Sequence, residues 1–274
     1  SRIDRDTLVV VLSAAYRDRL RYKTWWFPIV GSVPYKGYFD VHDARRAAAD
    51  LAREGFDAYL RPASAFSTLG YLEDPLLSTT LDEDSVELVN TVIHELTHNT
   101  FYASGQAVFN ESFANFVGTR GAEWFYSARG DSVRVEQARK DWARQKTLGR
   151  FWSAVYNSVD SAFKVHASSR DERLRARETV FTAARERFAT EIEPTLPGYN
   201  PDKRVALHLD NAALMSRRMY RTGLDDFDAI YEREGEKLPA AVARIIAIAR
   251  AAPKDPYAAV RAYVGSGSAE TAAK

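Results

Sequence analysis

The sequence predicts an α+β protein that is predominantly helical, with a small mixed sheet in its N-terminal part and a helical C-terminal body. Short aromatic and β-branched runs separated by glycine and proline are confined to residues 1–81, a pattern typical of strands joined by tight turns. After Asp82 the apolar residues recur at helical spacing. With 274 residues and 46% hydrophobic content, the chain can bury a sizeable core, and we expect one domain over residues 1–264.

The N-terminal part is expected to alternate between helices and strands. Residues 5–22 carry apolar side chains at helical spacing, and Asp4 or Asp6 can cap that helix. The stretch "KTWWFPIVGSVPYKGYFD" predicts short strands, and "VHDARRAAADLAREG" predicts a helix that ends at Gly55. The stretch "FDAYLRPASAFSTLGYL" then predicts two further strands, interrupted at Pro62.

The helical part is expected to begin at Asp82 or Asp84, either of which can cap a helix through "SVELVNTVIHELTHNTF". A second helix is predicted from about Asn110 to Tyr126, so that residues 82–130 hold this pair. The following part, residues 131–264, is expected to contain helices at 133–146, 150–190, 203–221, 225–233 and 239–252, with a break at Pro194, Pro197 and Gly198. Residues 265–274 are expected to form a disordered tail.

The composition excludes several classes of protein. The 38 lysines and arginines nearly balance the 37 aspartates and glutamates, and no block of like charge marks a surface for nucleic acid or membrane. The longest apolar stretches are too short to span a bilayer, so we expect a soluble chain. Its compartment stays open, and an anchor or signal upstream of Ser1 remains an alternative. Without cysteine, any metal must be held by histidine and carboxylate.

The stretch "HELTHNTFYASGQAVFNESFANFVG" carries the strongest chemical signal. His94 and His98 are four residues apart, so on an α-helix their imidazoles lie on one face and can reach a single ion. Glu95 lies about 100° around the helix from His94, which suits a group that contacts metal-bound water and not the metal.

A catalytic zinc site usually takes three protein ligands, and Glu111 is the obvious third candidate. Gly105 can form a turn that lays a second helix beside the first. The alternative is that these side chains are ordinary polar groups of two helices. Burial of two unpaired imidazoles and a glutamate in so apolar a helix would be costly, so the sequence favours a zinc site.

These segments also resemble known proteins. "HELTH" followed by "NESFANFVG" resembles the gluzincin metallopeptidases, in which a glutamate on a second helix completes the His-Glu-x-x-His site. The order of "WWFPIVGSVPYKGYFD", "SAFSTLGYLEDPLLST", "HELTH", "FNESFANFVG" and "LDNAAL" resembles the bacterial family described as putative aminopeptidases. The resemblance implies a zincin-like fold. The gap from His98 to Glu111 is shorter than in thermolysin-like members, so we expect a tight turn.

The resemblance also implies roles for single residues. It implies His94, His98 and Glu111 as zinc ligands, with Glu95 as the general base. Tyr220 ends "LDNAALMSRRMY", where the family pattern has a tyrosine, and is our first choice for the donor to the developing oxyanion. His208 and Tyr156 are the alternatives.

Further residues are expected around this site. Asn115, four residues after Glu111, can accept the outer N–H of a ligand histidine, or it can be a helix-surface residue. Ser67, Thr68 and Gly70 lie where gluzincins place an edge strand that pairs with the substrate backbone.

Three other residues are expected to be structural. We expect His42 and His166 at the surface or in packing, and Tyr38 in aromatic packing.

Together these features predict a zinc-dependent peptidase in which Glu95 activates metal-bound water, with aminopeptidase action as the first choice. An aminopeptidase must hold a free α-ammonium, for which Glu73 and Asp74 are candidates, although acidic residues before a proline are also common in turns. The alternatives are a zinc endopeptidase on short peptides, a non-catalytic zinc-containing peptide-binding module, and a metal-free helical interaction protein. Glu95 favours catalysis, because a structural zinc site needs no base and closes its fourth position.

Overall fold

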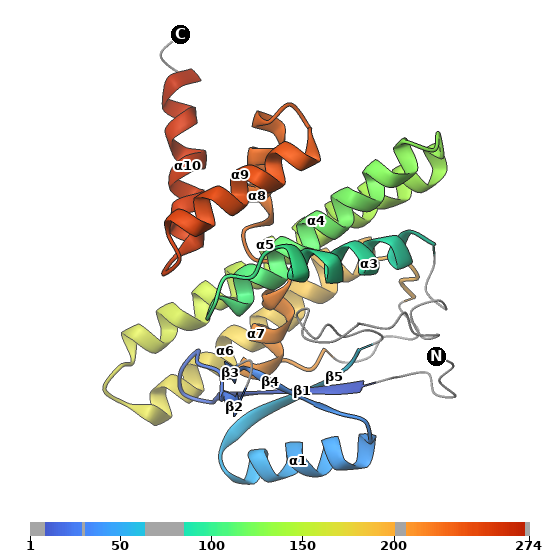
Figure 1. The fold of residues 1–274 in the computed structure, drawn as a ribbon. Helices are drawn as coiled ribbons and strands as arrows, with labels where there is room; N and C mark the ends of the chain where they lie inside the picture. Colours follow the sequence, from blue (N-terminus) through green and yellow to red (C-terminus); the bar gives the residue numbers. More distant parts are fainter. Residues whose placement is uncertain (1–8, 29–30, 64–84, 201–206, 272–274) are drawn as a thin grey trace. The chain divides into compact units, whose positions relative to one another are not determined.

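The computed structural model describes residues 9–28, 31–63, 85–200 and 207–271 (Figure 1). The chain divides into two compact units. Unit 1 comprises residues 1–6, 65–149 and 219–274, and unit 2 comprises residues 7–64 and 150–218. Helix α5, Ser132–Val165, contributes residues to both units. The prediction of a single domain stays a prediction.

Unit 2 contains a three-stranded antiparallel sheet with the order β4-β1-β5, formed by Tyr35–Tyr38, Val9–Tyr16 and Phe56–Ala63. Because β4 and β5 both run antiparallel to β1, helix α1 (Val41–Arg53) connects them as a crossover over the central strand. The short strands expected in residues 23–40 are confirmed, since β2 (Trp25–Phe27) and β3 (Gly31–Val33) form a separate hairpin beside β4 in sequence.

The helix predicted over residues 5–22 is wrong, because β1 occupies its centre. The run "VVVLSAAY" is apolar on consecutive positions, and such a run fits helical and strand spacing equally well. Leu12 and Ala14 pack with Leu51 of α1, whereas Ala15 packs with Met215 of helix α7 (Asn211–Met219). A strand buried on both faces has no alternation to reveal it, and its β-branched residues decide the outcome.

The interruption predicted at Pro62 is also wrong. Pro62 pairs with Val10 inside an unbroken β5. Since β5 is an edge strand, its outer N–H positions need no partner in the sheet, and a proline is tolerated there. The predicted end of α1 is confirmed: Gly55 follows the helix with φ +89°.

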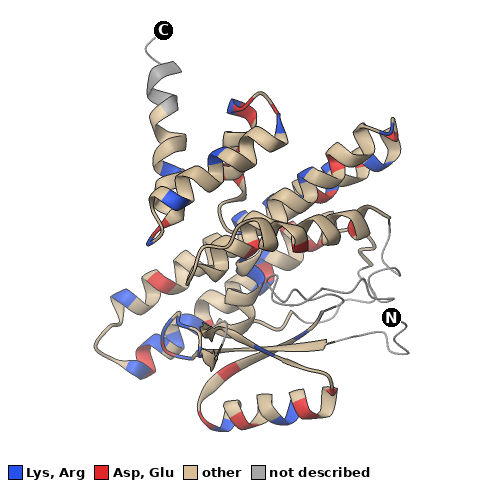
Figure 2. Ribbon diagram, viewed as in Figure 1, with Lys and Arg blue, Asp and Glu red and all other residues tan. Residues whose placement is uncertain are grey.

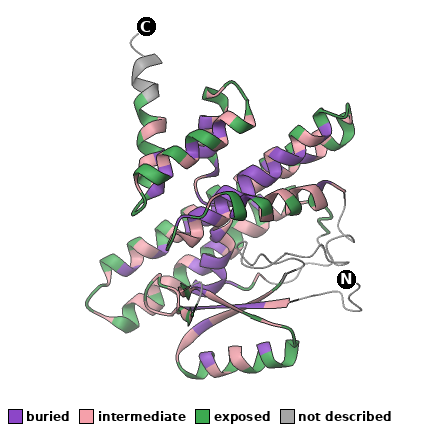
Figure 3. Ribbon diagram, in the orientation of Figure 1, coloured by how far each residue is buried: buried purple, intermediate pink, exposed green. Residues whose placement is uncertain are grey.

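Unit 1 is built from helices around an aromatic core. Its elements are α3 (Ser85–Thr100), α4 (Ala107–Ser127), the first part of α5, α8 (Leu224–Arg233), α9 (Leu238–Ala251) and α10 (Pro256–Thr271). Phe109, Phe113 and Phe116 of α4 are almost fully buried and pack against Phe227 of α8. Figure 3 shows buried residues along much of α4, which makes it the central helix of this unit.

One predicted break in the helical part is absent from the structure, and one observed break was not predicted. Helix α5 continues through residues 147–149, where a gap between helices was expected. The chain instead turns at residues 166–169, and Ser169 caps α6 (Arg170–Arg187). The break at Pro194 is confirmed, because a single π turn (Phe188–Ile192) and a 3₁₀ turn (Glu193–Thr195) end this part. Helix α10 runs to Thr271, into the segment expected to be a disordered tail.

The described structure is therefore mostly helical with a small sheet, as the predicted α+β class requires. The described strand pairings are all antiparallel, so the prediction of a mixed sheet is wrong for these residues. Among its described residues, no helix has the length and apolarity needed to cross a membrane. Basic and acidic residues are interspersed along α1 and α6, as Figure 2 shows, in agreement with the balanced composition.

Candidate metal centre

Helices α3 and α4 of unit 1 approach each other closely because α4 has glycines on the side that faces α3. A Cβ atom at Gly118 would stand 2.8 Å from the main-chain oxygen of Asn90 and 3.3 Å from Cβ of His94. A Cβ atom at Gly121 would stand 2.8 Å from Cδ1 of Ile93. Larger residues at these positions would push the helices apart, so the glycines set the distance between the side chains that meet across the helix pair.

The connection between α3 and α4 is short and fixed from within. Asn110 is 3% exposed, and its side-chain amide makes two hydrogen bonds to the main chain of Ala103, both at 2.9 Å. Its Oδ1 accepts from the N–H of Ala103, and its Nδ2 donates to the carbonyl oxygen of Ala103. Gly105 turns the chain with φ +75°. This is the tight turn expected from the short gap between His98 and Glu111, and it returns the start of α4 to the middle of α3.

The turn brings His94, His98 and Glu111 together. The two Nε2 atoms lie 3.2 Å apart, and they lie 3.4 and 3.7 Å from Oε2 of Glu111 respectively. All three candidate ligand atoms fall within 4.8 Å of one another. The three side chains are only 15%, 7% and 12% exposed, so water can compensate little of their charge.

The electrostatics of this cluster are dominated by burial and by mutual hydrogen bonds. Burial would raise the pKa of Glu111, but hydrogen bonds from both histidines outweigh it and hold that pKa far below its usual range. Burial would lower the pKa of His98, but the hydrogen bond and charge of Glu111, together with the charge of Glu95, raise it. The carboxylate therefore stays ionised, and the cluster attracts positive charge.

The donor set fits a zinc ion. Zinc–ligand bonds of about 2.0–2.1 Å in tetrahedral geometry place neighbouring ligand atoms about 3.3 Å apart. The observed separations of 3.2, 3.4 and 3.7 Å are close to this edge length. Two imidazoles and one carboxylate are also the ligand types left to a chain without cysteine.

Glu95 and Tyr220 border the same cluster. Glu95 is half-buried on α3, next to His94 in sequence, and its charge acts on His98. Tyr220 is also half-buried, and its ring centroid lies 6.1 Å from that of His94. The structure thus brings the predicted base and the first choice of oxyanion donor near the candidate ligands, all within unit 1.

Asn115 contacts the chain around Tyr220. Its amide Nδ2 donates a hydrogen bond to the main-chain oxygen of Tyr220 at 2.8 Å, and its side chain is buried. This contact differs from the one expected, in which Asn115 accepts the outer N–H of a ligand histidine. That expected contact stays a prediction.

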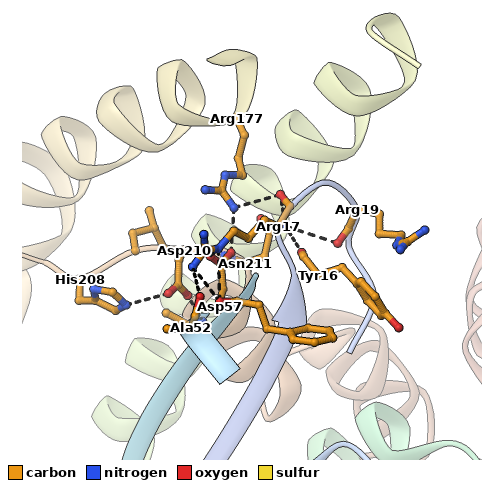
Figure 4. Close-up of polar contacts among 12 residues, drawn as sticks. Tyr16, Arg17, Arg19, Ala52, Asp57, Arg177, His208, Asp210 and Asn211 are labelled. Atoms are coloured by element: carbon orange, nitrogen blue, oxygen red, sulfur yellow. Dashed lines mark hydrogen bonds and ion pairs between the residues drawn. The ribbon is translucent and has the colours of Figure 1, made fainter. Parts of the chain in front are cut away.

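The motif "LDNAAL" lies in unit 2, where it anchors helix α7 (Figure 4). Asp210 accepts the main-chain N–H of Ala213 at 2.8 Å and caps the helix. Asn211 is fully buried and donates to the main-chain oxygen of Tyr16 at 2.8 Å, at the end of β1. His208 is 62% exposed and pairs with Asp210 at 2.9 Å.

A buried ion pair completes this anchor. Asp57 of β5 accepts the main-chain N–H of Asn211 at 3.0 Å and pairs with Arg177 of α6 at 2.8 Å (Figure 4). Burial raises the pKa of Asp57, although Arg177 opposes the shift. The motif therefore ties strands β1 and β5 to helices α6 and α7, and its residues have a clear structural role.

Some of the remaining candidates for substrate binding and catalysis lie among the residues that the structure describes, and others do not. Ser67, Thr68 and Gly70 lie outside the described residues, as do Glu73 and Asp74, so their roles stay predictions. Tyr156 is a half-buried residue of unit 2, where Arg218 lies over its ring. The alternative roles of Tyr156 and His208 as oxyanion donors are likewise still predictions.

The three residues that were expected to be structural behave as expected. His42 is exposed at the start of α1, and His166 is 39% exposed after α5. Tyr38 packs against the core of the sheet.

Sequence reasoning missed two residues that shape this region. Gly118 sets the approach of α3 and α4, and a glycine inside an apolar helical pattern is the signal that could have indicated it. Ser112 is fully buried on α4, next to Glu111, and bonds the main chain on both sides of Tyr220. Its sequence neighbourhood gives no sign of these partners, which lie more than a hundred positions away.

Comparison with known proteins gives one match. A model of the family described as "Putative aminopeptidase" matches residues 1–259. No curated protein and no solved structure matches the chain.

Proposed function

We propose that this chain, which belongs to the family described as putative aminopeptidase, is a zinc-dependent peptidase with a zincin-like pair of metal-binding helices. The observation that carries the proposal is the convergence of His94, His98 and Glu111 in one buried cluster with zinc-like ligand spacing. The family description supports hydrolysis of peptide bonds as the reaction.

Each residue of the centre has a chemical task in this proposal. His94, His98 and Glu111 hold the ion, and their burial limits competition from solvent. Zinc in this position would lower the pKa of a bound water and polarise the carbonyl of the bond to be cleaved.

The residues beside the ligands move the proton and bind the oxygen. Glu95 accepts the proton that the attacking water loses and returns it to the leaving amine. The phenol of Tyr220 donates a hydrogen bond to the carbonyl oxygen as negative charge develops on it. Glu95 suits its task because it lies on α3 beside the ligands without belonging to the cluster of three.

We further propose that the enzyme removes residues from the N-termini of peptides, which the family description favours. The competing possibility is cleavage of internal bonds in short peptides. A third is a binding module in which the metal has no catalytic task. The residues expected to hold a free α-ammonium, Glu73 and Asp74, lie outside the described residues and do not decide between these.

Cleavage mapping separates the three. The zinc-loaded protein is incubated with a mixed peptide library, in free and N-acetylated forms, and the products are identified by mass spectrometry. A parallel incubation with Glu95→Gln controls for contaminating proteases. Stepwise loss of N-terminal residues that acetylation blocks is the expected result. Internal cuts indifferent to acetylation would establish the endopeptidase instead, and identical products with both proteins, or none, would reject a peptidase.

A further inference from the structure

The connection that enters α8 is irregular and carries Tyr220. We call residues 219–223 the Tyr220 segment. It begins with Met219, the last residue of α7, and ends just before α8, and its residues 220–223 belong to no helix or strand. Such backbone depends on side chains to satisfy its buried N–H and C=O groups. The contacts of the segment within unit 1 show which side chains do so.

Ser112 satisfies the segment on both sides of Tyr220. Its hydroxyl donates to the main-chain oxygen of Met219 at 2.8 Å and accepts the main-chain N–H of Thr222 at 3.0 Å. A serine hydroxyl has one proton and two lone pairs, so both bonds can form at once. Ser112 is 0% exposed and Thr222 is 7% exposed, so water cannot replace the hydroxyl.

Asn115 adds a third bond from the same helix. It lies three residues after Ser112 on α4, and its Nδ2 donates a hydrogen bond to the main-chain oxygen of Tyr220 at 2.8 Å. The helix that carries Glu111 therefore also fixes the backbone at Met219, Tyr220 and Thr222. Helix α4 links the candidate metal ligand to the candidate oxyanion donor through a few short contacts.

Helix α5 and Tyr257 of α10 also contact the segment. A Cβ atom at Gly149 of α5 would stand 2.5 Å from the main-chain oxygen of Arg221, so the backbone lies directly against that helix. The hydroxyl of Tyr257 lies 3.1 Å from the oxygen of Thr222. The segment is thus contacted by α4, α5 and α10, which leaves little freedom for the backbone of Tyr220.

We propose that Ser112 is a positioning residue that fixes the main chain on both sides of Tyr220 and thereby holds its phenol beside His94. The proposal rests on the proposed function for the task of that phenol in peptide hydrolysis. A hydrogen-bond donor aimed at a transition state contributes most when it needs no rearrangement during the reaction. Ser112 supplies this preorganisation without contacting the substrate.

The position of Tyr220 can be measured without any assay of activity. The protein is labelled with 3-fluorotyrosine, and the resonance of position 220 is assigned by its loss in Tyr220→Phe. We expect Ser112→Ala to shift, broaden or split this ¹⁹F resonance. Tyr126→Phe is the matched control: it removes another hydrogen bond from α4 to the main chain, at Ser85, about 21 Å further along the helix. It should leave the resonance unchanged.

A second variant protects the test against loss of folding in Ser112→Ala. Gly149→Ala removes no hydrogen bond, but its methyl group presses on the oxygen of Arg221 from the side of α5. We expect it to change the same resonance. An unchanged resonance in both folded variants would overturn the inference, whatever the protein catalyses.

The catalytic consequence is tested by a double-mutant cycle. Ser112→Ala should lower kcat about tenfold with little change in KM, and zinc content should stay the same. In the Tyr220→Phe background the same change should lower kcat less than about twofold, because the group that Ser112 positions is already gone. If the effects of the two substitutions on kcat are independent and multiply in the double variant, Ser112 acts by another route and the inference is overturned. A wild type without hydrolysis would reject the proposed function, and the ¹⁹F result would still decide whether Ser112 fixes Tyr220.

Discussion

Glu111 and Asp228 are buried carboxylates of unit 1 whose pKa values are both lowered, but their partners differ. The side chains of Glu111 and Asp228 are 12% and 6% exposed. Burial would raise the pKa of each, and in both cases hydrogen bonds from neighbours outweigh burial and lower it. Helix α4 contributes to both clusters, through Glu111 near its start and through Arg120, which binds Asp228.

The partners of Asp228 can only donate. Arg120 donates from Nε at 3.1 Å, Trp142 from its indole N–H at 2.9 Å, and Lys146 from its ammonium at 2.5 Å. None of these groups has a lone pair to offer a metal. The cluster is complete as it stands, and its task is to hold α4, α5 and α8 together.

The partners of Glu111 are different in kind. A neutral imidazole carries a lone pair on one ring nitrogen, and the two Nε2 atoms face each other and the carboxylate. Three atoms able to bind a cation therefore converge around Glu111, whereas none of the partners of Asp228 can do so. A low carboxylate pKa therefore does not identify a metal site, whereas lone pairs on the groups around the carboxylate do.

The largest effect is expected at a third acid of unit 1. Glu95→Gln removes the proposed base but no ligand, so we expect about 1,000-fold slower peptide hydrolysis with unchanged zinc content. Asp228→Asn, assayed well below its unfolding temperature, should keep turnover within a few-fold of the wild type. Near wild-type hydrolysis by Glu95→Gln would leave the mechanism without a proton acceptor.

The next effect concerns stability. Asp228→Asn removes the carboxylate that pairs with Lys146 and one of the two carboxylates that pair with Arg120, the other being Glu123, which should lower the free energy of unfolding by about 3 kcal/mol. Urea unfolding followed by circular dichroism measures this. Glu232→Gln, an exposed position on the same helix, is the control and should change stability by less than about 0.5 kcal/mol. Equal effects of the two variants would show that the Asp228 cluster does not hold the helices.

The smallest effect is the pH dependence of that cluster. The pKa of Asp228 is lower in the folded state than its unfolded value of about 3.9. Its stabilising contribution is therefore fully present above that unfolded value and is lost as the pH falls through the lower, folded value. We expect the unfolding free energy of the wild type to fall more steeply below about pH 4 than that of Asp228→Asn. Parallel curves would contradict the direction of the shift.

The two clusters also differ in how far the sequence predicts them. His94, His98 and Glu111 lie within one stretch, where helical spacing and one short turn decide which side chains meet. The partners of Asp228 come from α4 and α5, more than eighty positions away, and no local pattern indicates them. Ser112 has the same kind of distant partners, which explains why the sequence pointed to its neighbour Glu111 and not to Ser112.

The fold shows the same limit. Four helices follow their apolar spacing and were predicted within a few positions, namely α3, α4, α8 and α9. The predicted bounds of α5, α6 and α7 differ from the structure, and α10 was not predicted. Strand β1 was not predicted, because a strand that is covered on both faces has no local periodicity. The continuous α5 was missed for a related reason. Gly149 lies inside this helix although glycine has a low helix propensity. A glycine is needed there because the main chain of Arg221 packs closely against it.

The most direct test of the comparison is the zinc content of four purified proteins: wild type, His94→Ala, His42→Ala and Asp228→Asn. Each is loaded with zinc, freed of excess metal and measured by elemental analysis together with protein concentration. We predict one zinc per chain in the wild type, in His42→Ala, which changes an exposed histidine, and in Asp228→Asn, which changes the donor-only cluster. His94→Ala should retain less than about a tenth of that amount, because two ligands hold zinc far more weakly than three. Equal zinc in His94→Ala and the wild type would contradict the account.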